Sequence, residues 1–185
     1  MEFRKLANNT INFGINRIIE ILSLGIIIAG ILLLISLVSF SPDDPNFIFP
    51  DNTEIKNFLG FRGSFTSDLF FQSSGLISLL IPFSLIISGI NIFLNKKIFL
   101  IIESIFYTII YSLLGSLFFS FFYLTPFDLY INGNGGFIGK YLETTFLITI
   151  INISPKIFYY LLIFLILILF LISIQFKISF FLKII

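Results

Sequence analysis

Residues 18–40 read IIEILSLGIIIAGILLLISLVSF, an apolar run in which Glu20 is the one charged residue. A helix needs about 20 apolar residues to cross the roughly 30 Å of bilayer hydrocarbon. The run is longer than the core of a signal peptide, about 7–15 residues, and no small-residue cleavage site follows it. It therefore predicts a retained transmembrane helix, and this decides the fold class.

Three further apolar segments have a similar length: 69–94, which contains Pro82, then 98–124 and 157–176. Composition agrees, because 57% of the residues are hydrophobic and only 11% are charged, against about 25% charged in a soluble domain. We expect one integral-membrane domain over 1–185, an all-α protein with four transmembrane helices and two external loops. The apolar segment 141–153 is too short to span and predicts an interfacial or re-entrant helix in the second loop.

Basic residues mark the side of the membrane that we expect to be cytoplasmic. They precede the first span, fill the short turn between the second and third, and follow the fourth: Arg4, Lys5, Arg17, Lys96, Lys97, Lys177 and Lys183. Loop 41–68 instead carries mostly acidic residues, namely Asp43, Asp44, Asp51, Glu54 and Asp68 against Lys56 and Arg62. We therefore expect both termini in the cytoplasm and loops 41–68 and 125–156 outside the inner membrane.

The residue types present exclude most catalytic chemistry. The chain has no cysteine and no histidine, so disulfides, thiol chemistry, the commonest metal ligand and the commonest general base are all missing. Its 11 basic residues are scattered and the net charge is +1, which argues against direct nucleic-acid binding. We expect no catalysis, no cofactor and no metal.

Residues 132–141, NGNGGFIGKY, look at first like a phosphate-binding loop. That motif needs Gly, four residues, then Gly-Lys-Ser/Thr. Gly139 and Lys140 have the right order, but Asn134 replaces the first glycine and Tyr141 replaces the hydroxyl residue. The loop also lies on the predicted external side, where ATP is essentially absent. We interpret it as a flexible Gly/Asn turn.

Glu103 is the one carboxylate well inside a predicted span. It lies about one and a half turns from the span's start, where a long side chain can reach the cytoplasmic interface. An ion or proton site and a contact with a partner helix are the alternatives. Without paired intramembrane carboxylates or internal repeats, secondary transport is poorly supported.

Small residues recur every four positions in three spans, a spacing that lets helix backbones approach closely. They are Gly25 and Ala29 in the first span, Ser84 and Ser88 in the second, and Ser112, Gly115, Ser116 and Ser120 in the third. These positions predict helix-packing seams. The seams serve either packing within one four-helix bundle or association between copies, and spacing alone does not distinguish the two.

The loop after the first span opens with Ser41, Pro42, Asp43, Asp44 and Pro45. Prolines cannot continue a helix and carboxylates cannot enter lipid, so the stretch is a helix stop. The order of residues goes further. SFSPDDPNF, together with NFLGFRGSFTSDLFFQSSGL before the second span, resembles the membrane-anchoring N-terminal domain of the FtsK/SpoIIIE family of bacterial DNA translocases.

The resemblance covers residues 15–180 and rests on three motifs in order. The first loop begins with a Ser-x-x-Pro-x-Asp-Pro-like pattern, a Gly-x-x-Gly-like segment leads to Ser-Asp-Leu, and a Gly-Gly-x-x-Gly segment lies in the second loop. The second and third motifs correspond to Gly60, Gly63, Ser67, Asp68, Leu69, Gly135, Gly136 and Gly139. The motif residues of both loops are candidate contacts for partners.

The family resemblance implies a non-catalytic septal anchor with a role in cell division and chromosome segregation. Its implied partners are the lipid bilayer, other division-septum membrane proteins, and further copies joined through a motor domain. The family's cytoplasmic linker and Walker-bearing ATPase motor, which make the full-length protein an ATP-driven DNA translocase, have no counterpart in these residues. The alternative is a stand-alone small multi-pass protein, either a motor-less division scaffold or an unrelated transporter subunit.

Overall fold

A computed structural model describes residues 2–45, 54–124 and 132–176 of the chain, with side chains from Thr10 onward. Within these ranges the structure is helical: α1 (Glu2–Val38), α2 (Gly60–Ser74), the 3-10 helix η1 (Gly75–Leu80), α3 (Ile81–Asn95), α4 (Phe99–Phe122), α5 (Gly136–Glu143), α6 (Leu147–Ile153) and α7 (Pro155–Ser173). Four segments are long and apolar enough to cross a membrane: Thr10–Val38, Gly60–Asn95, Phe99–Phe122 and Pro155–Ser173. The predicted all-α fold with four spans is confirmed.

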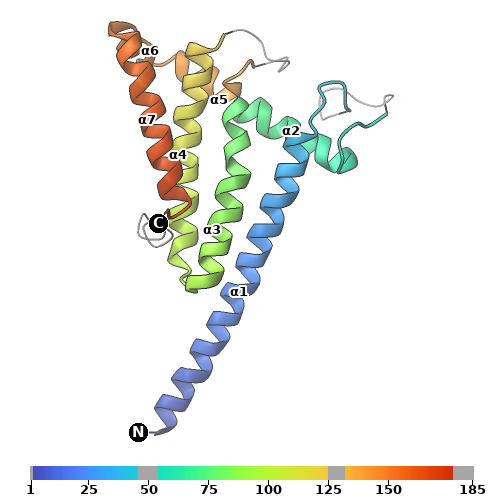
Figure 1. Cartoon of the computed structure of the whole chain (residues 1–185), viewed down its shortest axis with the longest axis vertical. Helices are drawn as coiled ribbons and strands as arrows, with labels where there is room; N and C mark the ends of the chain where they lie inside the picture. Colours follow the sequence, from blue (N-terminus) through green and yellow to red (C-terminus); the bar gives the residue numbers. More distant parts are fainter. Residues whose placement is uncertain (1, 46–53, 125–131, 177–185) are drawn as a thin grey trace, which may run out of the picture.

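The long helices stand in a row in the order α1, α3, α4, α7 (Figure 1). Each packs on its neighbour, whereas the described residues of α1 make no close contact with α4 or α7. α7 also reaches α3 through Ser84 and Ser173, so α3, α4 and α7 form a group and α1 packs on its outside, which is more open than a closed four-helix bundle. An open row is stable in lipid because the bilayer solvates the apolar faces that water would force together.

The second span differs from the predicted 69–94 because its sequence forms two helices at an angle. α2 lies across the ends of α1 and α3, and the chain turns through η1 into α3 (Figure 1). Gly75 at the junction has φ +72°, in the left-handed region that favours glycine. Pro82 lies in the first turn of α3, where its missing N–H leaves no helical hydrogen bond unmade. Asp68 is therefore inside α2 and not at the entrance of the span.

The second loop contains two short helices, α5 and α6, where the sequence predicted one over 141–153. The Gly/Asn stretch is also only partly a turn, because α5 begins at Gly136. A Cβ added at Gly139 would lie 2.4 Å from the carbonyl oxygen of Ser116 on α4. The glycine pattern thus serves close packing of α5 on α4, and the prediction of a flexible turn is wrong for this part.

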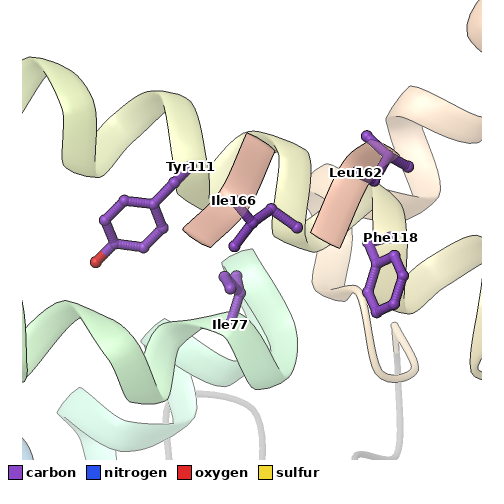
Figure 2. Close-up of a cluster of buried hydrophobic side chains, with 5 residues drawn as sticks. All are labelled: Ile77, Tyr111, Phe118, Leu162 and Ile166. Carbon is purple, nitrogen blue, oxygen red and sulfur yellow. The ribbon is translucent and has the colours of Figure 1, made fainter. Parts of the chain in front are cut away.

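A hydrophobic core lies between η1, α4 and α7. Its buried members are Ile77, Tyr111, Phe118, Leu162 and Ile166. Figure 2 shows Ile77 of η1 directed toward Ile166 of α7, while Tyr111 points away from both toward α3. The Tyr111 hydroxyl is 2.9 Å from Ser84 Oγ, which is also 2.9 Å from Ser173 Oγ. Ser84, a predicted packing residue, therefore joins α3, α4 and α7.

Within the chain, the first span packs through a face that does not include Gly25 and Ala29, so association between copies is the alternative that stays a prediction for these two residues. Gly25 and Ala29 are exposed, and nothing lies within 4 Å of a Cβ added at Gly25. The face toward α3 instead carries Ser23 and Gly30, where a Cβ added at Gly30 would lie 2.8 Å from Ile86. Gly25 is two residues from Ser23, about 200° around the helix, so the two cannot share a face. On α3, Ser88 is buried and donates to the Leu85 carbonyl.

The small residues of α4 pack closely, against the first part of the second span, in α2 and η1, and against the second loop. A Cβ added at Gly115 would lie 2.2 Å from Ile77 of η1, and Ser120 lies beside Gly135 and Gly139. Ser112 is buried, and its hydroxyl has no hydrogen-bond partner among the described residues. The seam therefore fixes the second loop to α4.

Charged side chains lie at the end of the helix row that carries the turn between α3 and α4, opposite α2. Glu20 of α1 is 2.7 Å from Lys96 Nζ and 2.5 Å from Arg17 Nη1, which ties α1 to the turn between α3 and α4. Sequence reasoning missed this pairing. Glu103 is half-buried on α4, and no described residue forms an ion pair with it.

Candidate functional site

Most of the predicted site residues gather at one end of the helix row, where both loops meet α2 (Figure 1). We name this region the cap and define it by its described residues, 39–45, 54–74 and 132–153. It lies opposite the turn that carries Lys96. Its geometry explains why the motif residues occur in their particular order.

Asp44 is buried, with 2% of its surface exposed, and it holds the segment of the first loop that returns toward α1. Its Oδ1 accepts the backbone N–H of Lys56 at 2.8 Å, and its Oδ2 accepts that of Asn57 at 2.8 Å. Hydrogen bonds to an ionised carboxylate are the stronger kind, and they satisfy a charge that burial would otherwise destabilise. Asp44 therefore folds the loop back onto the end of α1, beyond stopping the helix.

Asn57, which sequence reasoning missed, links α1 to α2. Its side-chain amide donates to the carbonyls of Ser36 at 2.9 Å and Ser39 at 3.2 Å. The last carbonyls of a helix lack intrahelical partners, so Asn57 caps α1 from outside the helix. Its Oδ1 accepts the N–H of Leu59 at 3.1 Å, two residues on, as Asn does in turns. That turn-forming position just before Gly60 was the signal that could have identified it.

The two glycines of the Gly-x-x-Gly segment are required for two different structural reasons. Gly60 has φ +63°, which lets the chain turn into α2 without a Cβ clash. Gly63 makes room for Asn57, because a Cβ added there would lie 2.1 Å from Asn57 Oδ1. The Gly63 carbonyl also accepts the Ser36 hydroxyl at 2.6 Å. Each glycine therefore permits one part of the junction between α1 and α2.

The buried face of α2 is polar. Ser64 Oγ donates to the Pro45 carbonyl at 2.8 Å, which joins α2 to the Ser-Pro-Asp-Asp-Pro motif. Ser67 Oγ bonds backbone carbonyls of its own helix. Asp68 is 8% exposed, and Gln72 Nε2 lies 3.5 Å from its Oδ1. The helix is thus held by directional hydrogen bonds as well as by Phe71, which packs on Leu33 and Leu37 of α1.

The second loop is held in the cap by two hydrogen bonds of Asn134, one through its backbone and one through its side chain. The Asn134 carbonyl accepts the N–H of Leu76 at 2.9 Å, and the Asn134 amide donates to the Tyr123 carbonyl at 2.8 Å. Gly75 and Gly136 face each other here with φ of +72° and +64°. Ser116 Oγ donates to the Ser74 carbonyl at 2.8 Å, so α4 supports the same junction.

Burial separates supporting residues from surface residues. The buried motif residues contact this chain itself, and they are Asp44, Pro45, Gly63, Ser67, Asp68, Gly135, Gly136 and Gly139. Ser41, Pro42 and Gly60 are half-buried, whereas Asp43 is exposed. Partner contact therefore stays a prediction for the exposed part of the motif alone. Phe58 adds to that surface, being 81% exposed while its N–H is held by Ser39 Oγ at 3.2 Å.

Asp43 pairs with Lys56 on the surface of the cap, at 3.0 Å between carboxylate and ammonium. The hydrogen bond and the negative charge of Asp43 raise the pKa of Lys56 above its usual range. In the part of the chain that the structure describes, no group of three or more carboxylates is placed to hold a metal ion. The described residues of the cap thus form a hydrogen-bonded core with charged side chains on its surface.

Comparison with known proteins gives one match. Residues 16–184 match the family model described as the 4TM region of DNA translocase FtsK/SpoIIIE, which is nearly the whole chain. No curated protein and no solved structure matches the chain.

Proposed function

The chain belongs to the family of FtsK/SpoIIIE 4TM regions, and from this premise we propose that it is the non-catalytic membrane anchor of a bacterial DNA translocase. It is a multi-pass membrane protein, with four apolar helices inside the matched residues. The observation that carries the proposal is that the match covers all four spans and corresponds to the membrane region of the family, not to its motor. The anchor holds the translocase at the division septum during chromosome segregation.

The cap faces outward from the inner membrane in this proposal, and both termini face the cytoplasm. Lys96 and Lys97 support this orientation, because they lie in the short turn at the end opposite the cap, and short cytoplasmic loops are rich in basic residues. A motor joined to the cytoplasmic side then lies on the same side as the chromosome.

The outward surface of the cap contacts other septal membrane proteins. Its internal order supports this role, because a helix stop alone requires only a proline and a few polar residues. Here Asp44 and Asn57 are buried to hold the loop, while Asp43 and Phe58 are presented at the surface. An ordered loop loses less conformational entropy when a partner binds.

Septal localisation of a fluorescent fusion tests this function. At equal abundance, Phe58→Ala combined with Asp43→Asn should lower septal enrichment, because both changes remove surface groups and leave Asp44 and Asn57 in place. Phe99→Ala is the matched control, since Phe99 is 68% exposed but lies at the start of α4, away from the cap. Equal septal enrichment of all three proteins would contradict a partner surface on the cap. Replacement of the whole chain by an unrelated four-span segment tests the anchor itself: full rescue of division would reduce it to a passive tether.

A further inference from the structure

A groove with a volume of about 360 Å³ lies between α1 and α2, with Leu85 of α3 also on its lining. Its α1 wall is formed by Ala29, Leu32 and Leu33, which belong to the membrane-spanning segment Thr10–Val38. α2 forms the other side, close to the end of that span (Figure 1). The groove is therefore open to the bilayer near the cap.

Arg62 of α2 is the one charged residue on this groove. Its side chain is exposed, and it forms no ion pair or hydrogen bond with any residue that the structure describes. The two hydroxyls on the groove are already engaged, since Ser36 donates to the Gly63 carbonyl and Thr66 to the Arg62 carbonyl. An anionic partner stabilises an exposed guanidinium at the edge of the lipid, and the planar fork of the guanidinium matches phosphate.

We propose that this groove binds one phospholipid from the leaflet on the cap side. The lipid phosphate lies on the Arg62 guanidinium, and one acyl chain lies along Ala29, Leu32 and Leu33. A peptide fits the groove less well, because its backbone N–H groups would find as side-chain acceptors only the hydroxyl oxygens of Ser36 and Thr66, and its C=O groups would find donors only on the Arg62 guanidinium. A phospholipid needs only a cation for its phosphate and an apolar wall for its chain.

A bound lipid gives the anchor a property that the spans alone lack. α2 lies across the end of the helix row, so a phosphate held by Arg62 fixes the height of α2 at the headgroup layer (Figure 1). The cap surface is then positioned relative to the membrane by a lipid as well as by the first span.

Native mass spectrometry of the purified full chain in detergent tests the site with three added probes. These are dioleoyl phosphatidylglycerol, dioleoylglycerol, which has the same chains without phosphate, and inorganic phosphate. We expect one phosphatidylglycerol per chain at low concentration, with dioleoylglycerol binding roughly tenfold more weakly because the charge-assisted hydrogen bonds are missing. Inorganic phosphate should not displace the phospholipid at comparable concentration.

Variants separate the charge from the groove. Arg62→Gln should weaken phosphatidylglycerol binding roughly tenfold, while Arg62→Lys retains part of it. Ala29→Phe fills the groove from an exposed position and should also weaken binding, although the charge remains. Lys140→Gln removes the same charge from an exposed residue of α5 outside the groove and should bind like the parent.

Several outcomes would overturn the lipid site. Equal binding of phosphatidylglycerol by the parent and by Arg62→Gln would do so, as would equal binding of phosphatidylglycerol and dioleoylglycerol. Displacement of the phospholipid by inorganic phosphate would also do so. So would a dimer that the parent forms and Ala29→Phe does not, because a second copy would then occupy the groove. Circular dichroism and thermal unfolding in the same detergent establish that each variant is folded. If Arg62→Gln does not fold, two other comparisons still test the lipid site: phosphatidylglycerol against dioleoylglycerol on the parent chain, and phosphatidylglycerol binding by the parent against Ala29→Phe.

Discussion

The Asp44 carboxylate accepts the backbone N–H of Asn57, thirteen positions further along the chain, at 2.8 Å, and the Asn57 side-chain amide caps the end of α1 in turn. Two buried polar side chains thus hold each other's segments in place. The junction that they form sets the position of α2, of the groove beneath it and of the exposed Phe58.

Replacement of Asn57 by Ala should destabilise the cap by about 1–3 kcal/mol, because the carbonyls of Ser36 and Ser39 lose their buried donor. Thermal unfolding in detergent and resistance of the first loop to proteolysis measure the effect. Asn95→Ala is the control, since the Asn95 amide donates to the Asn91 carbonyl on an exposed part of α3. Indistinguishable behaviour of the two variants would show that Asn57 does not hold the cap.

The two aspartates of the motif should differ sharply. Asp44→Asn places an amide against two backbone N–H donors and should open the first loop, with a cost of about 1–3 kcal/mol. Asp43→Asn removes only a surface ion pair with Lys56 and should change stability little. Hydrogen exchange of the Lys56 and Asn57 amides in nanodiscs distinguishes the variants. If both are silent, the motif is a helix stop and no more.

Two glycines provide a second matched pair. Gly63→Ala should disrupt the junction, because its Cβ would lie 2.1 Å from Asn57 Oδ1, whereas Gly25→Ala meets nothing within 4 Å. In α1 the latter change should be neutral or slightly stabilising, since Ala favours helix over Gly. Melting temperatures of the two proteins in one detergent test this, and a loss at Gly25 equal to that at Gly63 would contradict the packing described for α1.

Residues 132–141 should not bind ATP. The stretch wraps against α4 through Gly135 and Gly139, and its Lys140 lies exposed on α5. We expect no ATP binding by the purified chain in equilibrium dialysis, and Lys140→Ala should change neither stability nor septal localisation. ATP binding by the parent that Lys140→Ala abolishes would restore the phosphate-loop interpretation.

The apolar segments could be predicted from sequence because membrane crossing depends on length and composition alone. α4 at Phe99–Phe122 and α7 at Pro155–Ser173 lie within a few residues of the predicted 98–124 and 157–176. The angle between α2 and α3 could not be predicted, because it depends on the fit of Gly75 against Asn134, a residue of the distant second loop.

Spacing likewise identified small residues but not the elements that they meet. Ser116 and Gly115 on α4 contact Ser74 and Ile77, which lie within the predicted second span, whereas Ser120 meets Gly135 and Gly139 of the second loop, which spacing did not indicate. On α1 the same kind of spacing occurs at Gly25 and Ala29, yet the neighbour lies on the other face. The turn-forming position of Asn57 before Gly60 could have identified the turn, but its hydrogen bonds to the end of α1 could not be predicted, since they arise only when the loop returns to α1.

The side of the membrane that the cap faces decides whether the cap can contact external partners, and single cysteines in this cysteine-free chain measure it directly. Glu54→Cys and Lys140→Cys place an exposed thiol on the cap, and Lys97→Cys places one in the turn at the opposite end. In intact cells a membrane-impermeant maleimide should label Glu54→Cys and Lys140→Cys, while Lys97→Cys reacts only after lysis. Labelling of Lys97→Cys alone would place the cap in the cytoplasm and contradict the proposed external surface.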